Sequence, residues 1–339
     1  MKTTTIASHY VRAAIAGALK KGYSAGELLE QAGIGMELLS EPKARVYPDQ
    51  MAKLLRVLVT ELNDEFLGQD DKPSRRGTFE YLCRLVINSP SLGEALIHGT
   101  RYYGLFDMAM HTQYERSEEG GALVVNERRE CLNQDHYLTE YQLVLWHRLA
   151  CWLTGKRIPI DVAEFNFPRP SHADEYQYFF YGEHKFNQPR SLIRFEAKYL
   201  DLPIIRNEQD LEELLQEAPY VFLVKPNNTA SINAQIRQIL ERGQENEMPD
   251  FESIAFQLNT STQTLRRRLK DENTSFQEIK DQVRRDIAIY HLTQNKLSIN
   301  EIALKVGFTE PSTFHRAFKK WTGVTPGDYR QAEANPVID

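Results

Sequence analysis

The sequence is poor in the features that mark secreted, membrane-spanning or metal-binding chains. Its 339 residues include only three cysteines, Cys83, Cys131 and Cys151, without CxxC or Cys/His ligand spacing, which favours a reducing, cytoplasmic location. No apolar run approaches the roughly 20 residues of a membrane span, and the opening stretch MKTTTIASHY lacks the continuous apolar core of a signal peptide. The histidines at positions 98, 111, 136 and 147 form no i, i+4 pair, so we expect no metal site.

Motifs of catalysis and of cofactor binding are absent as well. The chain contains no GxSxG, HExxH or GxGxxG, and no carboxylate pair with an identifiable pocket. We therefore expect neither an enzyme nor a bound cofactor. An alternative is an enzyme domain fused to a nucleic-acid reader. Catalytic turnover by the isolated residues 1–220 would support it.

The composition is that of a two-domain globular protein with an uneven charge distribution. The hydrophobic fraction is 41% and the charged fraction 26%, and the formal net charge is −6. Residues 229–330 contain 15 Lys+Arg against 13 Asp+Glu, a balance of +2, whereas the remaining 26 against 34 give −8. If the C-terminal part binds a polyanion, this binding must therefore depend on a local basic face and not on the overall charge.

The last hundred residues contain one small helical unit twice, and the second copy is the clearer. Ser298 and Glu301 have the spacing of a capping box that starts a helix, and Gly307 is placed to end it. Thr309 is predicted to cap the next helix, with Pro311 in its first turn. One apolar face of the first helix is formed by Ile299, Ile302, Ala303 and Val306, and one of the second by Phe314, Phe318 and Trp321. Two helices joined by a tight turn, the second of them basic, indicate a helix-turn-helix.

The first copy lies about fifty residues upstream. Phe251, Ile254, Ala255 and Leu258 repeat the apolar spacing. Thr260 is predicted to cap the following helix, with Gln263 as its N3 partner, and Leu265 and Leu269 are predicted to face inward. A long amphipathic helix is expected between the copies, with Phe276, Ile279, Val283, Ile287 and Tyr290 on one face. Such a connector could hold two recognition helices about one DNA turn, 34 Å, apart.

The stretch from Ile299 to Arg330, INEIALKVGFTEPSTFHRAFKKWTGVTPGDYR, resembles the signature of the AraC/XylS family of bacterial transcription regulators. The resemblance is ungapped and continues into the first copy through LNTSTQTLRRRLKDENTSFQEI. It implies an all-α, DNA-binding domain with two helix-turn-helix units that bind double-stranded DNA. It also implies that residues on the second helix of each unit contact the DNA bases.

Geometry and the resemblance together select the candidate DNA-contacting residues. Arginine can read guanine and glutamine can read adenine bidentately in the major groove, and the helix starts can bind phosphate through free N–H groups. The predicted contacts in the first unit are Ser261, Thr262, Gln263, Arg266, Arg267 and Lys270, and those in the second are Ser312, Thr313, His315, Arg316, Lys319 and Lys320. Alternative roles stay open for two of these residues and for the neighbouring Arg268. Arg268 and Arg316 could pair with acidic residues of the same domain, and His315 could be a solvated surface residue.

The N-terminal two thirds read as short helices followed by strands with one long helix inserted. Helical spacing is clear before Gly104; two extended stretches, 108–117 and 121–129, then flank a turn at 118–121. A long helix with Leu138, Tyr141, Leu145, Trp146, Leu149 and Trp152 on one side follows, and further short strands are expected at 161–168 and 184–196. This order predicts an α+β domain, helices plus a small antiparallel sheet, with too few strands for a barrel.

The same part resembles the regulatory domain of one AraC branch, with an arabinose-binding-type domain like that of ornithine-utilisation regulators. The resemblance rests on LLEQAGIGMELLSEPKARV, SPSLGEALIHGTRYY and NQPRSLIRFEAKYLDLPI. It implies effector sensing and dimerisation. Candidate effector-lining residues are Tyr102, Tyr103, Phe106, His111, Trp146 and Tyr176, although these residue types more often form ordinary core and rim.

The sequence thus predicts a sensing and dimerisation domain at 1–217, a linker at 218–229 and a DNA-binding domain at 230–332. The predicted function is that of a cytoplasmic, homodimeric, effector-responsive transcription activator that also contacts RNA polymerase. The alternative is a DNA-binding regulator whose N-terminal domain only dimerises or receives a protein partner. The identity of the effector and the operator sequence do not follow from the residues.

Overall fold

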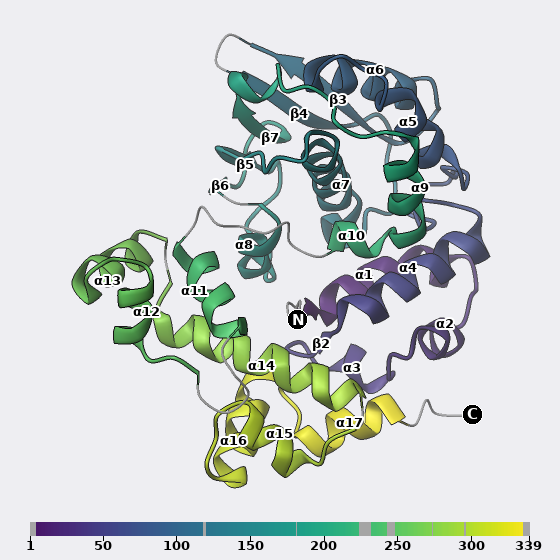
Figure 1. Ribbon diagram of the computed structural model, residues 1–339. Helices are drawn as coiled ribbons and strands as arrows, with labels where there is room; N and C mark the ends of the chain where they lie inside the picture. The colour runs from purple at the N-terminus through teal and green to yellow at the C-terminus, as the bar shows by residue number, and fades with distance from the viewer. Residues whose placement is uncertain are drawn as a thin grey trace. The chain divides into compact units, whose positions relative to one another are not determined.

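The computed structural model describes residues 5–117, 120–180, 182–223, 232–242, 248–272, 274–294 and 296–334 (Figure 1). The chain forms two compact units. One, the sheet unit, comprises His9–Ala32 and Ala52–Leu223. The other, the helical unit, comprises the described residues of Met1–Ser8, Gly33–Met51 and Val224–Asp339. Half of the predicted linker, residues 224–229, lies outside the described residues, as do both glutamates of the predicted turn at 118–121.

A five-stranded sheet with the order β3-β4-β7-β5-β6 organises the sheet unit. The strands are β3 (Met110–Arg116), β4 (Gly120–Glu127), β5 (Val162–Glu164), β6 (Glu183–Lys185) and β7 (Ser191–Glu196). β3 and β4 pair antiparallel with Met110 opposite Glu127, as the two predicted extended stretches require. The predicted antiparallel sheet is confirmed except at one edge, where β5 and β6 pair in parallel. The sheet stays open among the described strands, in agreement with the argument against a barrel.

Helices make up most of the rest of the sheet unit. They are α1 (Ser8–Lys20), α2 (Ala25–Ala32), α4 (Pro48–Leu62), α5 (Thr78–Val86), α6 (Leu92–Gly104), α7 (Tyr137–Thr154), α8 (Tyr176–Phe179), α9 (Glu208–Glu217) and α10 (Tyr220–Leu223), with single 3-10 turns at Gln134–His136, Ala173–Glu175 and Ala197–Tyr199. α6 packs against β3, and α7 packs against β3, β4 and β7 (Figure 1). The N-cap hydroxyl of Ser91 accepts the Glu94 N–H, so the cap predicted for α6 is present.

The central helix α7 is more buried than its sequence pattern predicts. Tyr141, Leu145 and Trp152 from the predicted inner stripe are only partly buried, whereas Gln142 and His147 are fully buried. The one-sided interpretation was therefore wrong. The reason is that α7 contacts three strands on one side and α6 and α10 on others, so that burial on this helix does not follow a single stripe.

Glycine is required where α1 crosses the turn after α4. A Cβ on Gly17 would lie 2.1 Å from the Leu67 carbonyl oxygen and 2.5 Å from the Gly68 carbonyl carbon, both backbone atoms that cannot swing away. Gly68 itself has φ +73°. The close approach holds the loop that follows α4 in place. Residues of this loop line the cavity described below.

We expect Gly17→Ala to lower the free energy of unfolding by about 1–3 kcal/mol, because overpacking against backbone forces α1 and the turn apart. The matched control is Gly26→Ala in α2, where the nearest atom to a new Cβ is a side-chain oxygen at 3.7 Å. There, alanine should be neutral or stabilising through its higher helix propensity. Urea denaturation of both variants measures the difference, and equal stabilities would contradict the packing account.

The helical unit contains a two-stranded antiparallel ribbon and the C-terminal helices. Its elements are β1 (Ile6–Ala7), α3 (Glu37–Ser40), β2 (Arg45–Val46), α11 (Ile232–Arg242), α12 (Phe251–Gln257), α13 (Thr262–Asp271), α14 (Phe276–Gln294), α15 (Ile299–Lys305), α16 (Pro311–Thr322) and α17 (Pro326–Ala334). The long helix α14 contacts α11, α15 and α17, and lies between the α12–α13 pair and the α15–α16 pair (Figure 1). The expected connector between the two copies is therefore present.

Residues from the start of the chain complete this unit around a buried aspartate. Thr5 Oγ1 donates to Asp286 Oδ1 at 2.6 Å, and Arg45 Nε donates to Thr5 Oγ1 at 2.7 Å. Asp286 also accepts hydrogen bonds from Arg237 and Arg285. Asp286 is 0% exposed. The domain boundaries proposed from the sequence do not anticipate that the described residues before His9, together with Gly33–Met51, belong to one unit with the C-terminal helices.

The described residues contain neither a membrane-spanning helix nor a cluster of metal-ligating side chains. None of the helices found there is long and apolar enough to cross a membrane. Nor does that part of the chain bring together three or more His, Cys, Asp or Glu side chains able to hold a metal ion.

Candidate functional site

The first helix pair is formed by α12 and α13, and both helices begin at a side-chain cap. The Asp250 carboxylate accepts the Ser253 N–H at 2.8 Å, and the Ser261 hydroxyl accepts the Thr264 N–H at 3.1 Å. The prediction that Thr260 caps α13 was therefore wrong by one residue. Thr260 belongs to the preceding turn, where its N–H donates to the Ala255 carbonyl at 3.0 Å.

The second pair, α15 and α16, confirms the capping box and the glycine stop. Ser298 and Glu301 exchange both hydrogen bonds of the box, and Gly307 has φ 80°, the left-handed conformation that ends a helix. The helix α16 begins at Pro311 with Glu310 as its N-cap, and no side chain caps it. Thr309 is thus not the cap, because the carbonyl that accepts the first helical N–H groups belongs to Glu310.

Both second helices bury one apolar face and leave the opposite face in solvent. Leu265, Leu269, Phe314 and Phe318 are at most 2% exposed. Of the twelve predicted DNA contacts, Thr262 and His315 are partly exposed and the others are exposed: Ser261, Gln263, Arg266, Arg267, Lys270, Ser312, Thr313, Arg316, Lys319 and Lys320. The ion pairs found among the described residues include none of the basic members of this set, nor Arg268. Uncompensated cations on two helix faces make a surface that attracts a polyanion.

The side chains next to these faces limit how the arginines can move. The Arg266 guanidinium lies over the Phe251 ring, 5.3 Å from its centroid, and Arg316 is 3.5 Å from the Thr313 hydroxyl on the preceding turn. On α14, Arg284 donates to the Gly307 carbonyl at 3.1 Å and lies over Phe308. Arg284 therefore fastens the turn of the second pair to the connector.

The length of α14 suits two reading helices on one duplex. Its 19 residues rise about 28 Å at 1.5 Å per residue. One turn of B-DNA is about 34 Å, so the connector spans most of the separation between adjacent major grooves on one side of the double helix.

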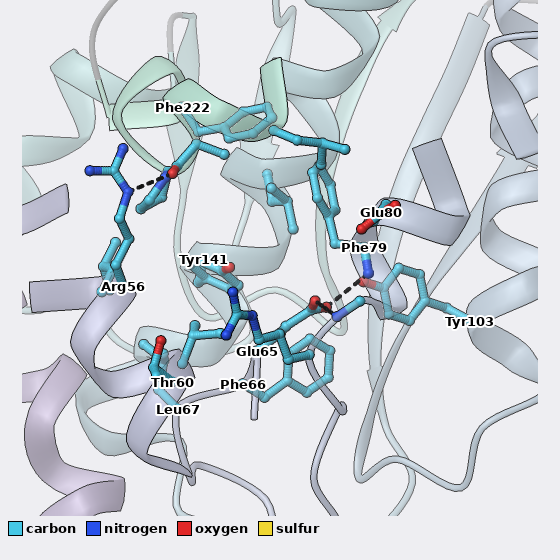
Figure 2. Close-up of a pocket in the computed structure, with 18 residues that line it drawn as sticks. Arg56, Thr60, Glu65, Phe66, Leu67, Phe79, Glu80, Tyr103, Tyr141 and Phe222 are labelled. Atoms are coloured by element: carbon cyan, nitrogen blue, oxygen red, sulfur yellow. Dashed lines mark hydrogen bonds between the residues drawn. The ribbon is translucent and has the colours of Figure 1, made fainter. Parts of the chain in front are cut away.

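The sheet unit contains a cavity of about 380 Å³ beside α4, α5, α7, α9 and α10 (Figure 2). Most of its lining is apolar: Leu55, Val59, Phe66, Leu67, Phe79, Tyr103, Tyr141, Leu145, Leu215, Ala218, Pro219 and Phe222. Its polar and charged side chains come from Arg56, Thr60, Glu65, Arg76 and Glu80. An apolar pocket of this volume with a few convergent polar groups is of the kind that takes a small organic ligand.

Glu65 is the most unusual group of this cavity. Its Oε1 accepts the Gly77 N–H at 2.8 Å and its Oε2 accepts the Phe79 N–H at 2.9 Å, at the start of α5 (Figure 2). Burial raises the pKa of Glu65 to about 7, against the lowering effect of the two backbone donors, with further raising by Asp64 and Glu80. The carboxyl thus titrates near neutrality.

The raised pKa predicts a pH dependence of stability. Because the folded chain binds a proton at Glu65 up to pH 7 and the unfolded chain only up to about pH 4.5, stability should rise as the pH falls through that window. We expect wild type to gain about 1–3 kcal/mol relative to Glu65→Gln between pH 8 and pH 5. Urea denaturation at the two pH values measures the gain, and parallel pH profiles for the two proteins would contradict the shift.

The predicted effector residues are only partly brought together. Tyr103 lines the cavity. Tyr102, Phe106 and Trp146 pack around it, with ring centroids 5.9, 6.4 and 6.0 Å away, but do not line the cavity. His111 is buried on β3 beside Gly104.

Tyr176 belongs to a separate buried polar cluster of the sheet unit. Its hydroxyl donates to Glu140 Oε1 at 2.6 Å, and the same carboxylate lies 2.8 Å from His172 Nε2. His172 in turn stacks on His9 at 3.7 Å between ring centroids. The cavity described above does not include these residues.

Sequence reasoning missed the residues that give the cavity its character. Tyr141 was assigned to a core stripe, and Glu65 and Arg76 lie in the irregular stretch between α4 and α5, where no periodicity indicates direction. The one available signal was an acidic pair, Asp64 and Glu65, directly after an apolar helix.

Comparison with known families accounts for both units. Residues 22–204 match the family described as the arabinose-binding domain of AraC transcription regulators, N-terminal. Residues 254–332 match a helix-turn-helix domain family.

Individual relatives include regulators from two bacteria. The chain is similar to the ornithine utilization regulator of Pseudomonas aeruginosa, with 28% identity over 315 residues that cover 92% of each protein. It is also similar to the HTH-type transcriptional activator CfaD of Escherichia coli, with 40% identity over 76 residues, 22% of this chain and 29% of CfaD. Among solved structures, that of the transcriptional regulator CdpR from Pseudomonas aeruginosa matches with 21% identity and a TM-score of 0.29, covering 74% of this chain and 81% of CdpR.

Proposed function

The chain belongs to the AraC family of transcription regulators, and from this premise we propose that it is an effector-responsive activator that reads DNA with α13 and α16. Its two family matches together cover the sheet unit and the helix pairs. It is a DNA-binding transcription regulator, and its relatives are regulators, not enzymes. The finer statements below are our proposal.

One observation carries the assignment of the reading surface: each recognition helix buries its apolar face and presents unpaired cations on the other. Arg267 and Arg316 occupy corresponding exposed positions, each six residues after the N-cap of its helix. We assign base reading to Gln263, Arg266 and Arg267 on α13 and to Thr313 and Arg316 on α16. The remaining predicted contacts, Ser261, Thr262, Lys270, Ser312, His315, Lys319 and Lys320, would position the helices on phosphates.

The sheet unit is assigned effector sensing and homodimerisation, with residues 1–217 as the sensing part, 218–229 as linker and 230–332 as the reader. A cytoplasmic metabolite that binds one state of the protein better than the other would change its affinity for DNA or for RNA polymerase. Similarity to an ornithine utilization regulator and to an activator supports control of a catabolic or signalling operon. Two copies would bind a repeated operator.

Genome-wide footprinting of the bound sites tests the proposal. We expect a small set of sites, each with two contacted major-groove segments about one helical turn apart. Uniform binding that follows only local charge, without a shared sequence, would contradict sequence-specific regulation.

A thermal-shift screen of the full chain against metabolites separates effector sensing from mere dimerisation. A ligand of the folded state raises stability by RT ln(1 + [L]/Kd), about 2.7 kcal/mol at a hundredfold excess over Kd. A hit must also change operator affinity. If no hit does so, the sheet unit serves dimerisation or a protein partner.

A further inference from the structure

The cavity of the sheet unit holds a carboxyl group without a cationic partner. Among the described residues, no lysine, arginine or histidine forms an ion pair with Glu65. Both carboxylate oxygens already accept one backbone N–H each. Each oxygen retains a further lone pair that can accept a hydrogen bond from a bound molecule.

Aromatic side chains surround this carboxyl. Phe66, Phe79, Tyr103 and Tyr141 all line the same cavity (Figure 2). The charge of Glu65 contributes to the raised pKa of both tyrosines, second only to their burial, so the phenols lie close to it. Neither phenol takes part in a hydrogen bond found among the described residues. A carboxylate that shares a cavity with several aromatic rings suits an organic cation, since rings attract positive charge through their faces.

The other charged groups of the cavity either form hydrogen bonds within the protein or are exposed to solvent. Glu80 Oε1 accepts two hydrogen bonds from Arg84, at 2.9 and 3.1 Å. Arg56 donates to the Ala218 carbonyl at 2.9 Å and to the Glu217 carbonyl at 3.2 Å, which holds the end of α9 over the cavity. Arg76 is exposed, so water and salt screen its charge.

We propose that this cavity binds a small organic amine, with the ammonium group on Glu65 among the aromatic rings and an apolar body along Leu55, Val59 and Leu145. The ammonium supplies the positive charge and the N–H donors that Glu65 lacks, and the phenol hydroxyls can turn toward a further polar group of the ligand. The lining, mostly apolar, takes up the carbon skeleton. That this amine is the regulatory effector rests on the proposed function.

Some residues that line the cavity lie close in sequence to the boundaries between the two units. Leu55, Arg56, Val59 and Thr60 belong to α4, whose first residues, Pro48–Met51, are part of the helical unit. Phe222 on the opposite wall lies one residue before the end of the sheet unit. A ligand that fills the cavity therefore contacts two of the chain segments that connect the units.

Binding of an amine should follow the ionisation of Glu65. The charged and titratable groups that face Glu65 or share the cavity are Asp64 on its own loop, Arg56 on α4, Arg76 before α5, Glu80 and Cys83 on α5, Tyr102 and Tyr103 on α6, and Tyr141 on α7. Burial raises the pKa of Glu65 to about 7, within the pH range of the test. Affinity should thus fall severalfold as the pH is lowered from 8 to 6, with proton release on binding below pH 7.

Isothermal titration calorimetry of the full chain tests the proposal with three probes of similar size: 2-phenylethylamine, its neutral analogue 2-phenylethanol and the acid 3-phenylpropanoate. We expect wild type to bind the amine at least tenfold more tightly than the alcohol, and the acid least. Glu65→Gln should lose this preference. Glu80→Gln, a change at the same cavity wall in a carboxylate that Arg84 occupies, should keep it within about twofold.

Tighter binding of the acid would instead assign the cavity to anions held by Arg76, and an unchanged preference in Glu65→Gln would remove Glu65 from the site; either result overturns the proposal. Thermal unfolding shows that each variant is folded, and Glu65→Asp, which keeps the charge, should retain part of the amine preference if Glu65→Gln proves unstable. Operator binding without any probe is measured in parallel. If wild type shows no amine preference but binds the operator, this inference alone is refuted. If wild type prefers the amine but does not bind the operator, the proposed function alone is refuted.

Discussion

Replacing Asp286 by alanine is expected to lower the free energy of unfolding by about 3–5 kcal/mol, the usual cost of removing one partner from a buried ion pair. The carboxylate is 0% exposed and accepts hydrogen bonds from Thr5, Arg237 and Arg285. Its loss leaves the Arg237 guanidinium, 5% exposed, with one carboxylate partner, Glu241, in place of two.

Urea denaturation with hydrogen exchange at α11 and α14 measures this effect where it arises. The control is Asp281→Ala on the same helix, whose partly exposed side chain accepts an amide hydrogen bond from Gln277; we expect a change within about 0.5 kcal/mol. A loss below about 1 kcal/mol in Asp286→Ala would show that the buried network adds little to stability.

The same aspartate is expected to make the helical unit less stable at acid pH. Burial alone would raise the pKa of Asp286, but the charges of Arg285, Arg237 and Arg45 outweigh it and lower the pKa below its ordinary value of 3.8. A carboxyl with a lowered pKa in the folded state contributes stability above its unfolded pKa and loses it as the pH falls further. Asp286→Ala should therefore be less pH-sensitive than wild type below about pH 4.

The second large effect is expected on DNA. Arg266→Ala and Arg316→Ala should each weaken binding to the native operator by about 1–3 kcal/mol, because a bidentate arginine–guanine contact contributes about that much discrimination. The two residues lie on separate helices, so that their effects should add to about 2–6 kcal/mol in the double variant. Each single variant should also relax the base preference at a different position.

Titrations of the operator and of single-base variants by fluorescence anisotropy at fixed salt measure these losses. Lys296→Ala, an exposed cation before α15 and on neither recognition helix, is the control and should change affinity by no more than about twofold. Weakening that is the same on every sequence would assign the substituted arginine to phosphate contact and remove its proposed reading role.

Local sequence signals were enough for most helices and for the exposed faces of α13 and α16. Ser298 with Glu301 and Ser91 with Glu94 define helix starts through bonds within one turn, and such bonds depend on nearest neighbours alone. The caps at Thr260 and Thr309 were misplaced by one residue because adjacent polar residues, Ser261 and Glu310, compete for the same role.

Features that depend on distant partners could not be predicted. The bond between Thr5 and Asp286 joins residues 281 positions apart, and no periodicity records such a pairing. Similarly, β5 and β6 have three residues each, too few to show alternation, so their parallel pairing did not emerge from the pattern. Glu65 acquires its raised pKa mainly from burial, in a cavity whose lining includes side chains far from it in sequence, such as Tyr141 and Phe222.

The most direct test of the central claim is base-resolution interference footprinting of wild type, Arg266→Ala and Arg316→Ala on one operator. If α13 and α16 read successive major grooves, each variant will lose contacts in one segment only, and the two segments will lie about 10–10.5 base pairs apart. Loss of the same contacts in both variants, or of contacts spread evenly along the site, would contradict two separately reading helices.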